Sequence, residues 1–488
     1  MVKRFYQLKL MKRRHHYKLT ILLITLLSAG CNLNTDLSIP EMPIPTEFQE
    51  TKEPRVETTV SNINWREYFE DPQLIQLIDT AVGNNLDLQI ALQRIETARS
   101  SIKLANSALL PKVDLDIGGG IRRFGLYTMD GAGNASTYIT DNQIVPEHLP
   151  DMYVGLLSTW EIDVWGKLHD QRRSAVSGYL ASIEGTNFVI SNLVSDVAIH
   201  YSELLALDNE LDIIRQTIRN QEEALEVIKL QKEAGRANEL AVQQFYAQHL
   251  NMQALEKEVL QKTIETENRL NFLLGRFPQP IERSKDKLFR AASHELSEGV
   301  PSELLENRPD IRAAEFEIKA SKFDLQVAKK SFYPSVNITA SFGFQAFDPE
   351  FLFTTPASIA YSVFGRLIAP LVNLKALEAK FNSAKANQIS AMYNYQKTIL
   401  NAHVEVANEL ANIKNLKQIN VLKKQQSDAL KQAVYISKEL YKSAKATYLE
   451  VLIAQQSALQ SNLDLIDATK QQRVSKIKLY KALGGGWR

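Results

Sequence analysis

Val336-Asn337-Ile338-Thr339-Ala340-Ser341-Phe342-Gly343-Phe344 alternates strictly between apolar side chains and small or polar ones. A period of two residues predicts a β-strand with one apolar and one polar face. Residues 113–117 repeat the pattern, and residues 153–162 and roughly 358–369 are the expected partner strands. Such strands suit a wall between lipid and water, and they suit a half-buried hairpin of a soluble sandwich equally well.

The number of strands favours a membrane-spanning barrel to which several chains contribute strands. Membrane barrels use about eight strands or more, so four strands cannot close by themselves. Open sheet edges are not tolerated in lipid. No stretch after the N-terminal region has the roughly 20 apolar residues of a membrane-spanning helix. We therefore expect several copies of the chain to share one barrel.

The chain is an internal duplication. Asp87 and Asp310 each lie 24 residues before a proline that opens a strand, which gives an offset of 223 between the copies. Gly275 and Gly484 end similar segments and are 209 residues apart. The difference places about 14 extra residues in the first copy, in the loop at 125–150. The expected repeats span residues 63–280 and 281–488.

Very long helices flank the strands. No proline lies between Pro150 and Pro278 or after Pro370, and the helical pattern from Leu168 to Gly235 could extend for about 100 Å. Apolar residues follow heptad spacing, as expected of antiparallel helical hairpins that turn near Gly235 and Ala444. Such hairpins could serve only to pack against one another. Alternatively, many hairpins arranged in a ring would enclose a hollow tube.

The N-terminus has the layout of a secretory signal peptide over residues 1–30. Seven Lys or Arg precede the apolar run 19–27, and Ser28-Ala29-Gly30-Cys31 follows. Cys31 is the only cysteine, and its position after small residues resembles a bacterial lipobox, which implies acylation of the thiol and a lipidated tether over residues 31–62. The alternative is an unmodified thiol. Ser28 stands where the motif usually has Leu.

Composition and motifs argue against a nucleic-acid-binding protein and against an enzyme. The 57 basic and 56 acidic residues nearly cancel, so no charge excess favours nucleic acid as a partner. The eight histidines show no metal-binding spacing, Gly118-Gly119-Gly120 lacks the Lys of a phosphate loop, and no nucleophile motif is present. We therefore predict no catalysis, no metal site and no cofactor.

Several motifs resemble those of TolC-like outer-membrane efflux factors, in particular the OprM-like lipoprotein branch. The strongest is Thr159-Trp160-Glu161-Ile162-Asp163-Val164-Trp165-Gly166-Lys167, and the resemblance covers the chain from about Trp65 onward. Further matches are Asn307-Arg308-Pro309-Asp310, Tyr448-Leu449-Glu450-Val451-Leu452 and Ala482-Leu483-Gly484-Gly485-Gly486-Trp487. The residues of this chain that match signature positions of the family are Glu161, Asp163, Trp165, Gly166, Arg308, Pro309 and Asp310.

The resemblance implies a mainly α fold with a small β part. Three chains would form a helical barrel in the periplasm below a twelve-stranded transmembrane barrel, lipid-anchored to the outer membrane of a Gram-negative bacterium. The implied function is the passive channel of a tripartite efflux system, with a periplasmic adaptor and an inner-membrane pump of the resistance-nodulation-division type. The alternatives are a type I protein-secretion duct and a pore-less periplasmic coiled coil.

The resemblance also implies sites at the hairpin ends. Gly235, Arg236, Ala444 and Lys445 are the expected adaptor-docking tips, and Tyr441 and Glu450 are expected at the periplasmic entrance. Three copies of Glu450 would ring a narrow pore and favour cations. Glu450 could equally be a solvated residue on a helix face. Ile453, Ala446 and Ala241 depart from the family pattern, which puts an identical entrance latch in doubt.

Overall fold

The computed structural model describes residues 63–289 and 303–488, in two compact units. The described part of the first unit comprises residues 97–179 and 317–392, and that of the second comprises residues 63–96, 180–289, 303–316 and 393–488. Each unit draws on both expected repeats. The repeat boundaries at 63–280 and 281–488 remain a proposal. The predicted signal peptide, Cys31 and the tether lie outside the described residues.

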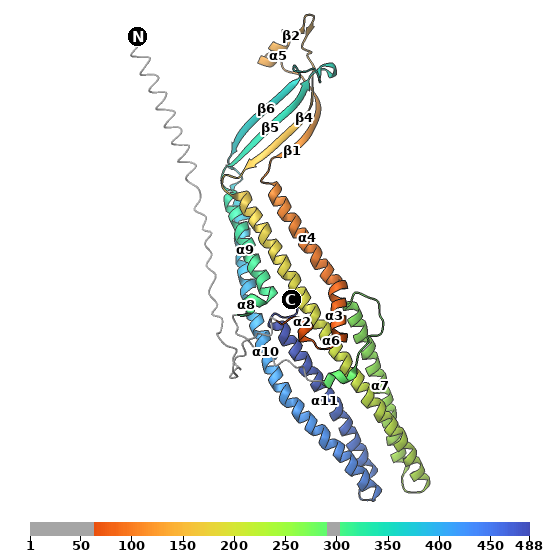
Figure 1. Cartoon of the computed structure of the whole chain (residues 1–488). Coiled ribbons are helices and arrows are strands. Elements are labelled where there is room, and N and C mark those ends of the chain that lie inside the picture. The colour runs from red at the N-terminus through yellow and green to blue at the C-terminus, as the bar shows by residue number, and fades with distance from the viewer. Residues whose placement is uncertain (1–62, 290–302) are drawn as a thin grey trace. The chain divides into compact units, whose positions relative to one another are not determined.

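The first unit carries a four-stranded antiparallel sheet in the order β1-β4-β5-β6 (Figure 1). The strands span Lys112–Arg122 (β1), Leu149–Ile162 (β4), Ser335–Ala346 (β5) and Ile359–Ile368 (β6). The four predicted strands are confirmed, and β4 begins four residues before the predicted start. β1 and β6 are the edges of the sheet.

The two faces of the sheet differ as the alternation predicts. Leu115 is opposite Leu156, Leu156 opposite Phe342, and Phe342 opposite Tyr361, so one row crosses all four strands. All four side chains are at least half exposed. One residue along, the opposite face carries Asp114, Leu157, Ser341 and Ser362, and the two serine hydroxyls are 2.7 Å apart. An exposed apolar face of this size needs a cover other than water.

The loop between β1 and β4 holds short elements that the sequence analysis does not predict. The first-copy loop also contains α5 (Met129–Asn134) and a small hairpin of β2 (Tyr138–Thr140) and β3 (Gln143–Ile144), which lie beyond the main sheet in Figure 1. Thr128 caps α5 by accepting a hydrogen bond from the Gly131 amide at 3.1 Å. These elements are too short, and their sequence too rich in Gly and Asn, to show a helical or strand period.

Helices make up most of the chain, and two of them are about 100 Å long at 1.5 Å per residue. They are α6 (Lys167–Glu233) and α10 (Leu374–Lys442), which α7 (Glu239–Leu273) and α11 (Tyr448–Ala482) follow. The shorter helices are α2 (Trp65–Tyr68), α3 (Pro72–Asn84), α4 (Leu86–Ser107), η2 (Lys285–Phe289), α8 (Glu303–Asn307), α9 (Pro309–Lys330) and η3 (Pro349–Phe351). In the described residues, no helix is apolar over a length sufficient to span a membrane.

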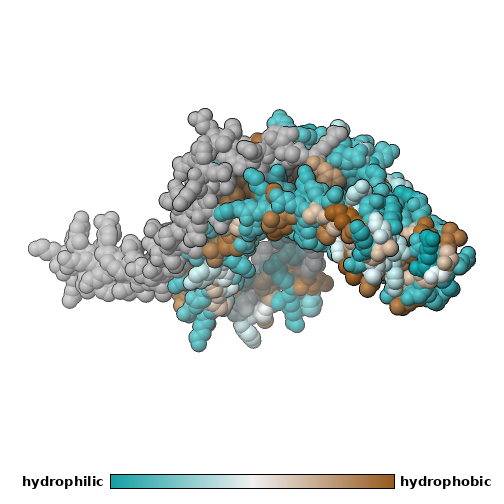
Figure 2. All heavy atoms as spheres, turned by 90° about the horizontal axis from the view of Figure 1, so that it is seen from below, coloured by the Kyte–Doolittle hydropathy of each residue, from teal (hydrophilic) through white to brown (hydrophobic). Residues whose placement is uncertain are grey.

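The core of the second unit lies where α3, α6, α7, α10 and α11 converge. Tyr201, Leu204, Leu270 and Ile466 are buried there. Tyr68 stacks on Tyr480 with ring centroids 4.0 Å apart. In Figure 2, hydrophilic residues cover most of the nearer helical surface, with hydrophobic residues in smaller groups between them.

The duplication is visible as two matched contacts in this unit. The side-chain amide of Asn85 donates a hydrogen bond to the Leu273 carbonyl at 2.9 Å, and the Arg308 guanidinium donates one to the Ala482 carbonyl at 2.8 Å. These residues are related by the offsets of 223 and 209 that the sequence predicts. In both copies, therefore, the end of the returning helix is tied to the turn before a 22-residue helix.

Candidate functional site

The hairpin ends have nearly the same backbone geometry in both copies. Gly235 follows α6 with φ 67°, and Ala444 follows α10 with φ 57°. The amide of Arg236 donates to the Gln231 carbonyl, and that of Lys445 to the Leu440 carbonyl, both at 2.8 Å. Such bonds close a helix with a left-handed residue, a conformation that favours glycine. The predicted turns at Gly235 and Ala444 are thus present, and Arg236 and Lys445 are exposed on them.

A small apolar cluster joins the two hairpins near these ends. Leu225, Ile228, Val242 and Phe245 of the first hairpin pack with Tyr441, Tyr448 and Leu452 of the second. The Tyr441 hydroxyl donates to the Gln231 side chain at 2.5 Å. Burial raises the pKa of Tyr441, so it is a neutral donor at physiological pH. Sequence reasoning missed Gln231, because a partner 210 residues away has no local signal.

Glu450 lies at the first turn of α11, where its carboxylate is bonded to Thr447, whereas Tyr441 is bonded to Gln231. Its carboxylate accepts hydrogen bonds from the Thr447 amide at 2.5 Å and the Thr447 hydroxyl at 3.0 Å, which forms a capping box. The Thr447 backbone hydrogen bond lowers the pKa of Glu450 below its ordinary value, so the carboxylate is charged at neutral pH. Ala241, the equivalent residue of the first copy, is buried instead.

Glu450→Gln separates the capping role from the proposed charge ring. Gln also serves at this position of a capping box, so α11 should keep its first turn while each chain loses one negative charge. If three copies surround the pore, cation preference should fall, and the reversal potential in a potassium chloride gradient should move toward zero. Glu233→Gln, at the exposed end of α6, is the control. An unchanged reversal potential in Glu450→Gln contradicts the ring.

The strand–helix junction of the first unit gathers the signature residues at 161–167. Asp163 accepts hydrogen bonds from the amides of Leu168 and His169 at 3.0 and 2.9 Å, so it caps the start of α6. Gly166 makes the turn with φ 71°. Glu161 pairs with Lys167 at 2.6 Å. The motif is therefore the device that changes a strand into a long helix.

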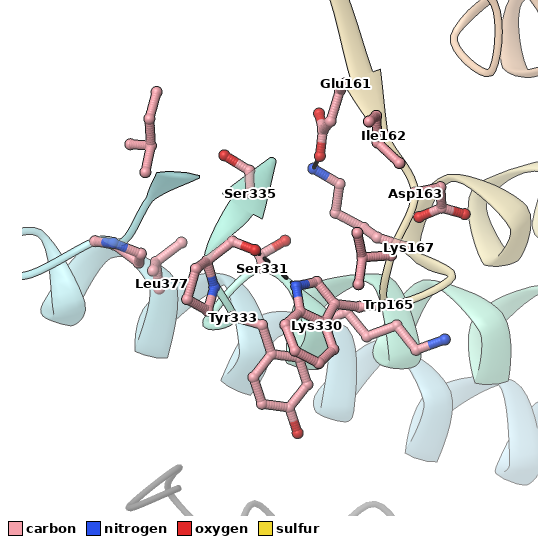
Figure 3. Close-up of a pocket in the computed structure, with 14 residues that line it drawn as sticks. Glu161, Ile162, Asp163, Trp165, Lys167, Lys330, Ser331, Tyr333, Ser335 and Leu377 are labelled. Atoms are coloured by element: carbon pink, nitrogen blue, oxygen red, sulfur yellow. Dashed lines mark hydrogen bonds and ion pairs between the residues drawn. The ribbon is translucent and has the colours of Figure 1, made fainter. Parts of the chain in front are cut away.

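Trp165 ties this turn to the second copy. Its indole nitrogen donates to the Pro334 carbonyl at 2.6 Å, and its ring lies 5.3 Å from that of Tyr333 (Figure 3). A cavity of about 260 Å³ is bordered by these aromatic rings and by the Glu161–Lys167 pair. Lys330 donates to the Gly166 carbonyl and pairs with buried Asp170 at 2.6 Å, a pairing that the sequence did not indicate.

Arg308 is buried in the second unit, with 5% of its side chain exposed. Its guanidinium donates to both Asp310 oxygens at 2.7 and 3.1 Å, and to Glu405 at 2.8 Å. Burial lowers the pKa of the guanidinium, and the Asp310 and Glu405 carboxylates outweigh that effect, so the pKa lies above its ordinary value. Pro309 starts α9. The signature residues Arg308 and Asp310 therefore form one ion-pair network.

The charged groups of these sites make contacts within the protein. Within the described residues, no three His, Cys, Asp or Glu side chains are placed to hold a metal ion. The charged groups at both signature motifs are paired with one another or with backbone groups. These contacts hold strands, helices and hairpins together, as a structure built from long helices requires.

Comparisons with known proteins bear on this arrangement. Residues 77–276 and 300–485 match the family "Outer membrane efflux protein". The chain is 27% identical over 475 residues to cation efflux system protein CusC of Escherichia coli O6:H1, covering 96% of this chain and 99% of that protein. It is 28% identical over 484 residues to "Probable outer membrane lipoprotein SilC" of Salmonella typhimurium, with the same coverage.

A solved structure agrees with the fold over nearly the whole chain. A membrane protein from Pseudomonas aeruginosa superposes with a TM-score of 0.82 at 26% identity, covering 92% of this chain and 99% of that one. The resemblance in sequence therefore extends to the arrangement of strands and helices.

Proposed function

Since the chain belongs to the outer membrane efflux protein family, we propose that it is the outer-membrane channel of a tripartite efflux system. It is a passive duct for small molecules, namely drugs, toxic compounds or metal cations, and it carries out no reaction itself. The relative named as a cation efflux system protein supports cations as one substrate class. A periplasmic adaptor and an inner-membrane pump of the resistance-nodulation-division type supply the substrate and the energy.

The observation that carries the proposal is the two-faced sheet. The row of Leu115, Leu156, Phe342 and Tyr361 presents apolar side chains where a soluble protein would have polar ones. Lipid is the cover that suits this face, and the Asp114 and Ser341 face suits a water-filled lumen. The sheet ends in open edges at β1 and β6.

Closing those edges requires other copies of the chain. Backbone groups at an open edge cost several kcal/mol each in lipid. Three chains in a ring, with β6 of one beside β1 of the next, give a closed wall of twelve strands and a homotrimer. The same symmetry gathers six hairpins in the periplasm, with their exposed ends at Gly235, Arg236, Ala444 and Lys445 available to the adaptor.

Conductance across a planar lipid bilayer tests the proposal. The purified full-length chain should produce ion-conducting steps. A purified protein that never raises bilayer conductance would instead favour a pore-less periplasmic coiled coil. Export of a polypeptide, in place of small molecules, by cells that carry the cognate pump would favour the protein-secretion duct.

Acylation of Cys31 is a separate prediction. Cys31→Ser removes the only thiol of the chain, so incorporation of labelled palmitate should fall to background. The relative named as a probable outer membrane lipoprotein supports the modification. Ser28→Leu, which brings the preceding residues closer to the usual lipobox, is the control and should retain the label. Persistent labelling of Cys31→Ser would refute a lipid anchor at this position.

A further inference from the structure

The helical segments next to the sheet carry a concentrated positive charge. Residues 97–111, 163–179, 317–334 and 370–392 contain twelve Lys or Arg and five Asp or Glu. All four segments belong to the first unit. Because the whole chain has a formal net charge of only +1, the remaining residues sum to −6. We call these four segments the basic belt.

Ion pairs within the protein involve only some of the cations of the basic belt. Lys167, Arg173 and Lys330 pair with carboxylates at the strand–helix junction. Five other cations of the belt are exposed, and no carboxylate of the described residues pairs with them. They are Lys103, Arg172, Lys322, Lys375 and Lys380. An unpaired group of like charges on one part of a protein is unfavourable unless an anionic partner covers it.

One part of the belt is hollowed. His169, Arg172 and Arg173 border a shallow cavity of about 300 Å³, with Val176 and Phe323 as its apolar wall. The Arg173 guanidinium carbon lies 5.8 Å from the centre of the Phe323 ring. Guanidinium groups bind phosphate oxygens in a forked geometry, and an apolar wall beside them suits the carbon chain attached to a phosphate.

The belt lies at the depth of lipid headgroups if the sheet spans the hydrocarbon. Arg172 is five residues beyond the start of α6, Lys380 six beyond the start of α10, and Lys103 four before the end of α4. At 1.5 Å per residue these cations lie within about 10 Å of the helix ends. The headgroup layer is about 5–8 Å thick on each side of the hydrocarbon, and surface charge acts over about a further 8 Å.

We propose that the basic belt binds the phosphate groups of anionic phospholipids in the periplasmic leaflet of the outer membrane. The inference rests on the proposed function, because it requires the sheet to lie in that membrane. Bound headgroups would neutralise the belt and set the depth at which strands give way to helices. Three chains in a ring would surround the channel with 21 net positive charges, since each belt carries +7.

Lipid titration of the full-length trimer in detergent tests the proposal. Native mass spectrometry would count bound dihexanoyl phosphatidylglycerol, with dihexanoyl phosphatidylcholine and inorganic phosphate as separate arms. The belt variant carries Arg172→Gln, Lys322→Gln and Lys380→Gln. Each cation near an anionic lipid surface is worth about a fivefold change in binding, so the variant should bind phosphatidylglycerol at least about tenfold more weakly. Added salt should weaken binding to the wild type in the same way.

The matched control removes three exposed lysines elsewhere, Lys417→Gln, Lys424→Gln and Lys438→Gln, and should bind as the wild type does. Equal binding of phosphatidylglycerol and phosphatidylcholine, or wild-type binding by the belt variant, would overturn the inference. Inorganic phosphate binding as tightly as phosphatidylglycerol would identify a free-anion site and overturn the lipid assignment. Bilayer conductance of the wild type separates the two proposals. If the wild type does not conduct, the proposed channel function is rejected. If it conducts but binds phosphatidylglycerol and phosphatidylcholine equally, only the proposed lipid binding by the basic belt is rejected.

Discussion

Arg308→Ala is expected to destabilise the folded chain by about 3–5 kcal/mol, the usual cost of removing one partner from a buried ion-pair network. The substitution leaves the carboxylates of Asp310 and Glu405 facing each other without their shared cation, and it frees the Ala482 carbonyl. Because Ala482 ends α11, the second hairpin loses one of its attachments to the start of α9. Thermal unfolding of the detergent-solubilised protein, followed by circular dichroism at 222 nm, measures the effect.

Arg66→Ala is the control for this experiment. Arg66 pairs with one carboxylate, that of Asp79, at 2.5 Å, and both side chains are about half exposed. Exposed pairs contribute about 0–1 kcal/mol, so unfolding of this variant should stay close to that of the wild type. Equal destabilisation by Arg308→Ala and Arg66→Ala would show that the buried network does not hold the second hairpin.

Gly275→Ala is the second substitution with a large expected effect. Gly275 has φ 64°, and an added Cβ would collide with the Asn84 carbonyl oxygen. The left-handed conformation costs about 1–2 kcal/mol for alanine, and forcing the backbones apart costs about 1–3 kcal/mol more. The end of α7 would then separate from the turn between α3 and α4. A lower temperature of thermal unfolding and a smaller yield of trimer are the expected results.

Gly235→Ala isolates the conformational part of this cost. Gly235 has nearly the same φ, 67°, and nothing lies within 4 Å of the added Cβ. The second copy carries Ala444 at the matching turn, so this chain already accepts alanine there. We expect a loss of about 1 kcal/mol or less, because alanine also restricts the unfolded chain. If Gly235→Ala were as damaging as Gly275→Ala, the close approach at Asn84 would not be the cause.

Local patterns in the sequence were sufficient for most of the fold. Alternation of side chains predicted two strands of the main sheet, because the period of two residues is a property of each strand alone, and the other two strands were expected as their partners. The absence of proline and the heptad spacing predicted α6 and α10, and the equal offsets predicted the duplication. The small elements α5, β2 and β3 were missed, because two to six residues are too few to show a period.

The roles of the candidate site residues depended on partners far away in the chain. The sequence identified Tyr441, but not Gln231, its hydrogen-bond partner 210 residues earlier. It identified Arg308 and Asp310, but not Glu405 or the Ala482 carbonyl. For Glu450 the decisive partner, Thr447, is local, and the pattern of a capping box was available in Thr447-Tyr448-Leu449-Glu450.

The sequence by itself determined the family, the strand faces and the long hairpins, since each of these depends on which residues follow one another. Tertiary structure alone decided that Arg308 and Tyr441 join segments remote in the chain, that Ala241 is buried, and that four basic segments form one belt in which five cations are left unpaired. The reason is physical: burial and ion pairing depend on distances between residues that are remote in the chain, and no local pattern encodes those distances.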